Sequence, residues 1–384
     1  MAAMLIDTNS QLAAFCESLR GEPAIFLDTE FVGEGYYHKR LGTIQMGSAS
    51  EAAIIDALAV DDMAPLGRLL ADPDVVKVFH AATQDLQILV RLFGAPVAPL
   101  FDTQVAAQLT TGDEQIGFDR LVTRITGQSP ASGHSFTDWL RRPLTPGQIE
   151  YALDDVRLLV PVYQWQCAKL AELERESWAA EEFAKLEDPE RFVPTDPDQQ
   201  YMRIRGFDNL SGPALAALRA LAAWRERTAR EMDIPVGRIA RDETLTELAM
   251  RPRKATRDLR DIRAFRPDQI SRYGADLLRV AAEGRKQPPP PRRPRVSLPA
   301  GLEPTVDFMA LCLRSLAEEA SVAATAVATR SDLVALVLGG DQADIPLLSG
   351  WRRPAFGEGL LAALSGKAVA RIRPEDQTVH LEWQ

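Results

Sequence analysis

Residues 24–31 read AIFLDTEF, an apolar run followed by two acidic residues that alternate with a threonine. The run Ala24–Leu27 has the length and composition of a buried β-strand that leads into Asp28. Side chains two apart on a strand project from the same face, so Asp28 and Glu30 can converge on one cation. A polar strand terminus gives the same pattern by chance, and the motif therefore needs support from the rest of the chain.

Two further acidic motifs lie in the first half of the chain. Asp85 lies within HAATQDL (residues 80–86), and Asp155 ends YALDD (residues 151–155). Tyr151 and Asp155 are four apart on a predicted helix, which stacks them on one face, although an amphipathic helix with an edge tyrosine has the same spacing. Together the four carboxylates can hold two hard divalent cations, one activating water and the other stabilising the leaving oxygen of a phosphodiester.

The composition is that of a globular protein with more than one domain. The chain has 384 residues, 46% of them hydrophobic and 26% charged, and this length favours two or three domains. No apolar run approaches the roughly 20 residues that span a bilayer, and the first residues lack the pattern of a signal peptide. Three widely separated cysteines without a Cys-x-x-Cys pair argue against a disulfide framework or a thiolate zinc site. These features predict a cytoplasmic protein with no membrane association.

Charge is unevenly distributed along the chain. The net charge is −10, yet residues 1–200 carry 15 basic and 31 acidic side chains, whereas residues 208–295 carry 20 basic and 12 acidic ones. One interpretation is that the acidic front holds cations and the basic middle meets an anionic polymer; ordinary variation among solvated helices is the alternative. The strongest candidates for phosphate contacts recur at helical spacing, namely Arg253, Arg257, Arg260 and Arg263. An arginine-rich helix paired with its own aspartates explains the same spacing.

The pattern of elements predicts an α/β front followed by helices. We expect a hairpin of Thr43–Gly47 with Ala52–Ile55 and a strand at Val75–Phe79. The predicted helices are Thr83–Leu92, Thr103–Leu109, Phe118–Ile125 and a long one from Pro146 through Glu182, which Thr145 and Gln148 start as a capping box. The predicted domains are residues 1–200, a helical domain at 208–286, a proline-rich basic linker at 287–298, and a second helical domain at 299–375.

On these motifs the chain resembles the DEDD superfamily of 3′→5′ exonucleases, in the subclass with tyrosine in its third motif, and within it the ribonuclease D family. FDTQ (residues 101–104), TDW (137–139) and RPL (142–144) stand in the order and approximate spacing of that family. Trp224 to Pro252 resembles its helical HRDC domain, and 299–375 is similar to a diverged second copy. The resemblance implies a ribonuclease H-like α/β exonuclease domain, with a mixed sheet and helices, followed by two small all-α domains.

The resemblance also implies roles for individual residues. It makes Asp28, Glu30, Asp85 and Asp155 the metal ligands and Tyr151 the residue that orients the attacking water. Two cations would neutralise the crowded carboxylates, and all-oxygen ligation suits Mg²⁺ or Mn²⁺. A tyrosine, with a pKa near 10, is a poor base at neutral pH and a better hydrogen-bonding partner for water.

Three neighbouring polar residues have structural interpretations. Asp154 lies about 100° around the helix from Asp155 and is assigned to a solvated or supporting position. Asp102 is expected to cap the helix that follows it. His80 is expected to be a hydrogen-bonded histidine, either in the core or in support of the metal ligands, rather than a ligand itself.

One segment departs from the family pattern. Relatives carry a lysine and another basic residue shortly before TDW, whereas residues 132–136 here read SGHSF. His134, Arg141 or Arg142 are the candidates to replace any phosphate contact from this loop.

The predicted function is a 3′→5′ exoribonuclease that releases nucleoside 5′-monophosphates, with a role in trimming the 3′ ends of tRNA precursors or other structured RNA. No obligate protein partner is evident in the sequence. A DNA exonuclease of the repair type is one alternative, although no P-loop is present. A non-catalytic nucleic-acid-binding protein that retains the fold is the other, and four clustered carboxylates disfavour it because they repel phosphate.

Overall fold

The computed structural model describes residues 4–130, 133–134, 137–251, 259–262, 264–291, 298–375, 377 and 379–383. The chain divides into two compact units. Unit 1 comprises Met1–Glu30, Gly42–Phe192 and Val296–Gln384, and unit 2 comprises Phe31–Leu41 and Val193–Arg295. Within unit 1 we call residues 1–30 and 42–192 the α/β portion and residues 296–384 the C-terminal portion.

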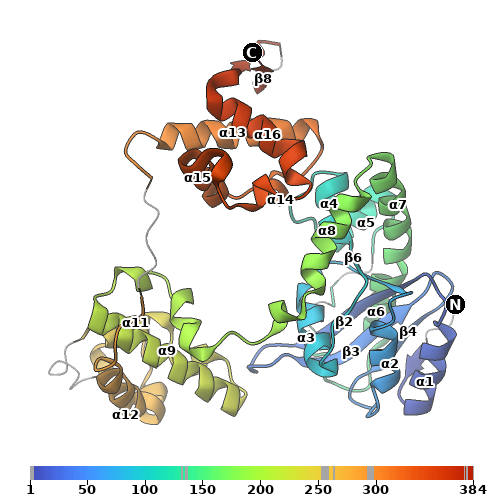
Figure 1. The fold of residues 1–384 in the computed structure, drawn as a ribbon. Coiled ribbons are helices and arrows are strands. Elements are labelled where there is room, and N and C mark those ends of the chain that lie inside the picture. Colours follow the sequence, from blue (N-terminus) through green and yellow to red (C-terminus); the bar gives the residue numbers. More distant parts are fainter. Residues whose placement is uncertain are drawn as a thin grey trace. The chain divides into compact units, whose positions relative to one another are not determined.

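The α/β portion is built on a six-stranded mixed sheet with the order β1-β4-β3-β2-β5-β6 (Figure 1). Its strands are β1 (Met4–Ile6), β2 (Ala24–Val32), β3 (Arg40–Gly47), β4 (Ala52–Asp56), β5 (Val76–Phe79) and β6 (Leu100–Asp102). The predicted hairpin is confirmed, since β3 and β4 pair antiparallel with Gly47 opposite Ala52. β2 pairs parallel with β5, and β5 pairs parallel with β6. The strand order places β2 between β3 and β5, inside the sheet. Residues 24–27 of β2 are all buried, which requires cover on both faces of the sheet.

Eight helices accompany this sheet in the described part of the α/β portion, and α4, α5 and α7 pack together (Figure 1). They are α1 (Asn9–Ser18), α2 (Ala64–Leu70), α3 (Thr83–Phe93), α4 (Thr103–Thr110), α5 (Phe118–Thr126), α6 (Pro146–Arg157), α7 (Leu159–Glu172) and α8 (Glu176–Glu187). The predicted helices that correspond to α3, α4 and α5 are confirmed to within a residue or so at each end.

The single long helix predicted from Pro146 through Glu182 is wrong. The chain forms α6, α7 and α8 there, with breaks at Leu158 and before Glu176. Pro161 explains the first break, because proline fits the first turn of a new helix and obstructs the interior of a continuous one. Glu174, in the left-handed region with φ +56°, accounts for the second break.

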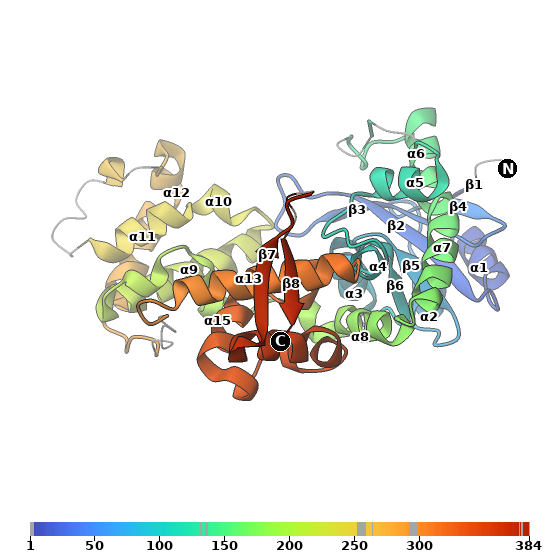
Figure 2. The same cartoon turned by 90° about the horizontal axis from the view of Figure 1, so that it is seen from above.

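The C-terminal portion is a helical bundle with a β-hairpin at its end. Its helices are α13 (Glu303–Glu319), α14 (Ala324–Val327), α15 (Arg330–Gly339) and α16 (Glu358–Ala362), and its strands are β7 (Ala368–Ile372) and β8 (Val379–Trp383). Figure 2 shows the antiparallel hairpin beside α13, which β8 contacts. The hairpin adds β structure to a segment for which we expected helices alone.

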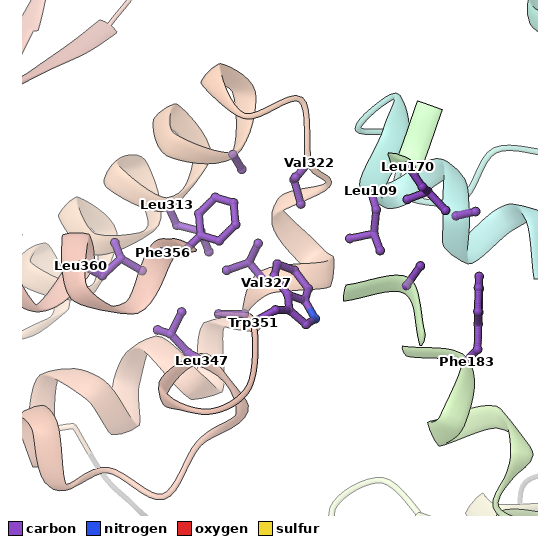
Figure 3. Packing of buried hydrophobic residues seen from close by; sticks show 14 of the residues in the cluster. Leu109, Leu170, Phe183, Leu313, Val322, Val327, Leu347, Trp351, Phe356 and Leu360 are labelled. Carbon is purple, nitrogen blue, oxygen red and sulfur yellow. The ribbon is translucent and has the colours of Figure 1, made fainter. Parts of the chain in front are cut away.

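The C-terminal portion packs on α4, α7 and α8 of the α/β portion through one hydrophobic cluster (Figure 3). The rings of Trp178 on α8 and Trp351 stack with centroids 4.6 Å apart. Arg175, 8% exposed, donates to the backbone oxygens of Leu109, in the last turn of α4, and of Ala320, which caps α13. The two portions therefore share one core.

Unit 2 is a helical domain that also incorporates the segment Phe31–Leu41. Its helices are α9 (Gly212–Met232), α10 (Val236–Ile239), α11 (Asp242–Met250) and α12 (Pro267–Gly284). The segment is held by polar contacts: Tyr37 donates to Glu226, and Asp233 accepts from the His38 amide at 3.0 Å and from Arg40 at 3.2 Å. The connection between β2 and β3 is thus part of the helical unit.

Candidate active site

β2 positions the first two acidic residues. Asp28 and Glu30 lie within the strand, which continues to Val32, rather than at its end as predicted. Alternation along the strand directs both side chains to one face. Glu30 is only 9% exposed, so its charge is largely withdrawn from water.

The other two carboxylates come from helices. Asp85 lies in the first turn of α3 and is buried; it accepts a hydrogen bond from the hydroxyl of Thr29. Asp155 lies on α6, which begins with the predicted capping box: the Thr145 hydroxyl accepts from the Gln148 amide at 3.2 Å, and the Gln148 side chain accepts from the Thr145 amide at 3.0 Å. This cap fixes where the helix starts and hence which residues face the sheet.

The structure brings the four carboxylates together, and we call Asp28, Glu30, Asp85 and Asp155 the carboxylate cluster. One carboxylate oxygen from each of Asp28, Glu30 and Asp155 lies within 4.8 Å of the other two. Asp85 is outside this triad but near enough for its charge to raise the pKa of both Asp28 and Glu30.

The electrostatics of the cluster are unfavourable without a counter-charge. Burial, and then repulsion by the other carboxylates, raises the pKa of Asp28 well above its ordinary value and that of Glu30 to about 8. Burial also raises the pKa of Asp155 to about 7, although a hydrogen bond from Tyr151 opposes the rise. Buried and partly buried carboxylates that crowd together in this way are stabilised by bound cations. Because every donor is a carboxylate oxygen, the cluster fits hard divalent ions better than zinc.

Tyr151 lies on α6 one turn before Asp155, to which it donates a hydrogen bond. Its ring sits near those of His134 and Trp139, with centroids 6.0 and 6.1 Å away. His134 also lies over Gly147, where a Cβ atom would come within 2.8 Å of its Nε2. The tyrosine is therefore held by its hydroxyl at one end and by neighbouring rings along its side.

The supporting interpretations of Asp102 and His80 are confirmed. Asp102 accepts from the amides of Gln104 and Val105 at the start of α4, and it also holds the turn before α3 by accepting from the amides of Ala81 and Ala82. His80 lies 2.8 Å from the Thr103 hydroxyl through its Nδ1, and burial lowers its pKa. Both residues connect the ends of β5 and β6 to the helices that follow.

The candidates for phosphate contacts differ in their availability. Arg142 is engaged inside the protein, where it forms a bidentate ion pair with Asp56, whereas Arg141 is exposed. Of the four arginines predicted at helical spacing, Arg260 lies in a three-residue 3₁₀ helix, Leu259–Asp261. The other three, Arg253, Arg257 and Arg263, lie outside the described residues.

No helix among the described residues combines the length and apolar character needed to cross a bilayer.

Comparison with known proteins gives one consistent family. Residues 4–166 match the family described as 3′-5′ exonuclease, and residues 214–280 match the HRDC domain. The chain is 40% identical to the ribonuclease D of Granulibacter bethesdensis over 94% of its own length and 93% of the relative's. It is 39% identical to that of Acidiphilium cryptum, with 96% and 95% covered. The crystal structure of Escherichia coli RNase D, described as an exoribonuclease involved in structured RNA processing, has a TM-score of 0.84 at 30% identity and covers 95% of this chain and 99% of that one.

Proposed function

Because the chain belongs to the ribonuclease D family and is a divalent-metal-dependent 3′→5′ exoribonuclease, we propose that the carboxylate cluster is its catalytic centre. The observation that carries the proposal is the juxtaposition of buried and partly buried carboxylates, two of which, Asp28 and Glu30, have pKa values raised by burial and by repulsion from the others. Such an arrangement costs stability unless cations occupy it. The all-oxygen donor set favours Mg²⁺ or Mn²⁺ as the two ions.

The residues of the centre would divide the work of hydrolysis. Two bound cations would activate a water molecule and neutralise the charge that develops on the phosphodiester. Tyr151 would orient the water, because its hydroxyl is already placed beside Asp155 on the same helix face. A phenol is a weak base at neutral pH, so positioning rather than proton removal is the role that fits it. Each turnover would release one nucleoside 5′-monophosphate.

We further propose that the substrates are the 3′ ends of tRNA precursors or other structured RNA. The involvement of the Escherichia coli relative in structured RNA processing supports this choice. The charge distribution supports it too, because residues 208–295 carry an excess of basic side chains in the region of the HRDC match. The candidates for phosphate contacts are Arg253, Arg257, Arg260 and Arg263.

One incubation tests the class and the polymer together. The full-length protein is mixed with RNA and DNA of matched single-stranded sequence, each labelled at its 5′ end, with Mg²⁺ or with a chelator. We expect a ladder that shortens from the 3′ end on RNA and only with Mg²⁺. Equal degradation of DNA would favour a repair-type exonuclease, and binding of both polymers without any cleavage would favour a non-catalytic binding protein. An unlabelled tRNA precursor, added as competitor, should slow cleavage more than an equal mass of single-stranded RNA.

A further inference from the structure

Arg142 uses all five of its N–H donors inside the protein. Nε and Nη2 donate to the two carboxylate oxygens of Asp56 at 2.6 and 2.7 Å. Nη2 also donates to the backbone oxygen of Gly42 at 2.8 Å, and Nη1 donates to those of Trp139 and Arg141 at 2.9 and 3.0 Å. A guanidinium has no further donors, so Arg142 has none left for a substrate phosphate.

The ion pair joins the segment before α6 to the end of β4. Asp56 ends β4 and its side chain is 8% exposed, while that of Arg142 is 25% exposed. Although burial opposes it, the hydrogen bonds from Arg142 hold the pKa of Asp56 below its ordinary value. At Gly42 of β3, a Cβ atom would come within 2.4 Å of the backbone oxygen of Trp139, so glycine is required for this approach. The backbone at Trp139 is therefore seated directly on the sheet.

Trp139 connects this anchor to the candidate catalytic tyrosine. Its side chain is completely buried, and its ring is 6.1 Å from that of Tyr151, centroid to centroid. A second tie runs from the same segment to α6, where the Gln148 side chain donates to the Thr137 hydroxyl at 3.1 Å. A displacement of the segment would thus move the surface against which Tyr151 packs.

We propose that the Asp56–Arg142 pair positions Tyr151 by holding Trp139 between α6 and the neighbouring strands β3 and β4. The inference rests on the proposed role of Tyr151 in orienting the attacking water. Hydrolysis depends steeply on such placement, because a misplacement of about 1 Å can lower a rate by about 10². Arg142 itself touches neither substrate nor the reacting atoms.

Two other roles for Arg142 make different predictions. An arginine that bound RNA phosphate would change KM, and lysine would replace it in part because lysine keeps the charge. An arginine that only stabilised the fold would lower the melting temperature and leave the kcat of the folded enzyme unchanged. A positioning arginine lowers kcat with little change in KM, and lysine fails to restore it because lysine cannot make the five directed hydrogen bonds.

The experiment is a double-mutant cycle on the full-length protein, with kcat and KM measured on one 5′-labelled single-stranded RNA. The variants are Arg142→Gln, Arg142→Lys, Tyr151→Phe and the two combinations with Tyr151→Phe. Arg352→Gln is the matched control, because it removes another little-exposed arginine–carboxylate pair of unit 1, with Glu182 at 2.7 Å. Melting temperatures of all variants separate loss of fold from loss of rate. Where Arg142→Gln does not fold, Arg142→Lys carries the same test.

We expect Arg142→Gln and Arg142→Lys each to lower kcat by about 10- to 10²-fold with KM nearly unchanged, and to have little further effect in the Tyr151→Phe background. The Arg352→Gln variant should lose melting temperature without losing kcat. Equal effects of Arg142→Gln with and without the tyrosine hydroxyl would overturn the inference, as would an effect confined to KM or to melting temperature. Wild-type kcat in Tyr151→Phe alone would instead refute the proposed role of the tyrosine, and the inference with it.

Discussion

Binding of metal ions to the carboxylate cluster is expected to expel protons from the protein at neutral pH. The pKa of Glu30 is about 8 and that of Asp155 about 7 in the metal-free protein. At pH 7 these two groups therefore hold about 0.9 and 0.5 protons, and Asp28, with its pKa raised well above the ordinary value, adds to the total. Because carboxylates bind metal in the ionised form, binding should release between about 1.4 and 2.4 protons.

The number can be measured by titration calorimetry with Mn²⁺ at pH 7, in buffers that differ in their heat of ionisation. The slope of the observed enthalpy against the buffer enthalpy gives the protons released. The affinity should rise with pH by about tenfold or more per unit between pH 6 and 7, and flatten above about pH 8. The variant Glu30→Gln should lower the release by at least about 0.9 protons, because it also removes a charge that raises the pKa of Asp28. The variant Glu17→Gln, at an exposed position, should not alter the release.

The same pKa values predict how the metal-free protein responds to pH. A carboxyl group whose pKa is raised in the folded state binds its proton more tightly there than in the unfolded chain. Its contribution to the stability of the folded state is therefore fully present below the unfolded pKa and is lost as pH rises through the folded pKa. For Glu30 this window extends from about pH 4.5 to about pH 8. Unfolding free energy in a chelator should fall across that range and recover on addition of Mg²⁺. Metal binding with no proton release and no pH dependence between pH 6 and 8 would refute the electrostatic account of the cluster.

Three further predictions concern the tyrosine, the C-terminal portion and the basic segment. In the variant Tyr151→Phe, kcat should fall by about 10²-fold with little change in KM. Steady-state assays that show only an increase in KM would make Tyr151 a substrate-binding residue. Removal of residues 299–384 exposes Trp178 and should lower the melting temperature of unit 1 by about 10 °C, as expected for a loss of about 3 kcal/mol in unfolding free energy. A calorimetric melting temperature equal to that of the wild-type protein would contradict a shared core. The four arginines of the basic segment are Arg253, Arg257, Arg260 and Arg263. Their replacement by glutamine should lower the slope of log K against log salt concentration by about 0.7 for each phosphate interaction that is removed. An unchanged slope on a tRNA precursor would exclude these arginines as RNA-binding residues.

The sequence was sufficient to predict the features that depend on local patterns. The spacing of two residues on β2 and of four residues on α6 determines which side chains share a face, and both spacings are read directly from the sequence. The Thr145–Gln148 capping box is equally local, and it placed the start of α6 correctly. The long helix failed for a local reason that was also visible, since Pro161 forbids it.

Other features depend on interactions between distant parts of the chain. The hydrogen bond from Thr29 to Asp85 and the pair of Asp56 with Arg142 join residues 56 and 86 positions apart, and no spacing rule indicates them. Similarly, the inclusion of Phe31–Leu41 in unit 2 follows from its interactions with α9 and with Asp233 at the end of that helix. The docking of Trp178 on Trp351 requires the tertiary structure of both portions.

The most direct test of the proposed centre is the turnover of Asp155→Asn on 5′-labelled RNA at saturating Mg²⁺, with RNA binding measured on the same preparation. The substitution keeps the size of the side chain but removes one of the charges that hold the cations, and it lessens repulsion of the phosphate. We predict no detectable cleavage together with binding at least as tight as that of the unaltered protein. Turnover near the wild-type rate would contradict the assignment of the carboxylate cluster as the catalytic centre.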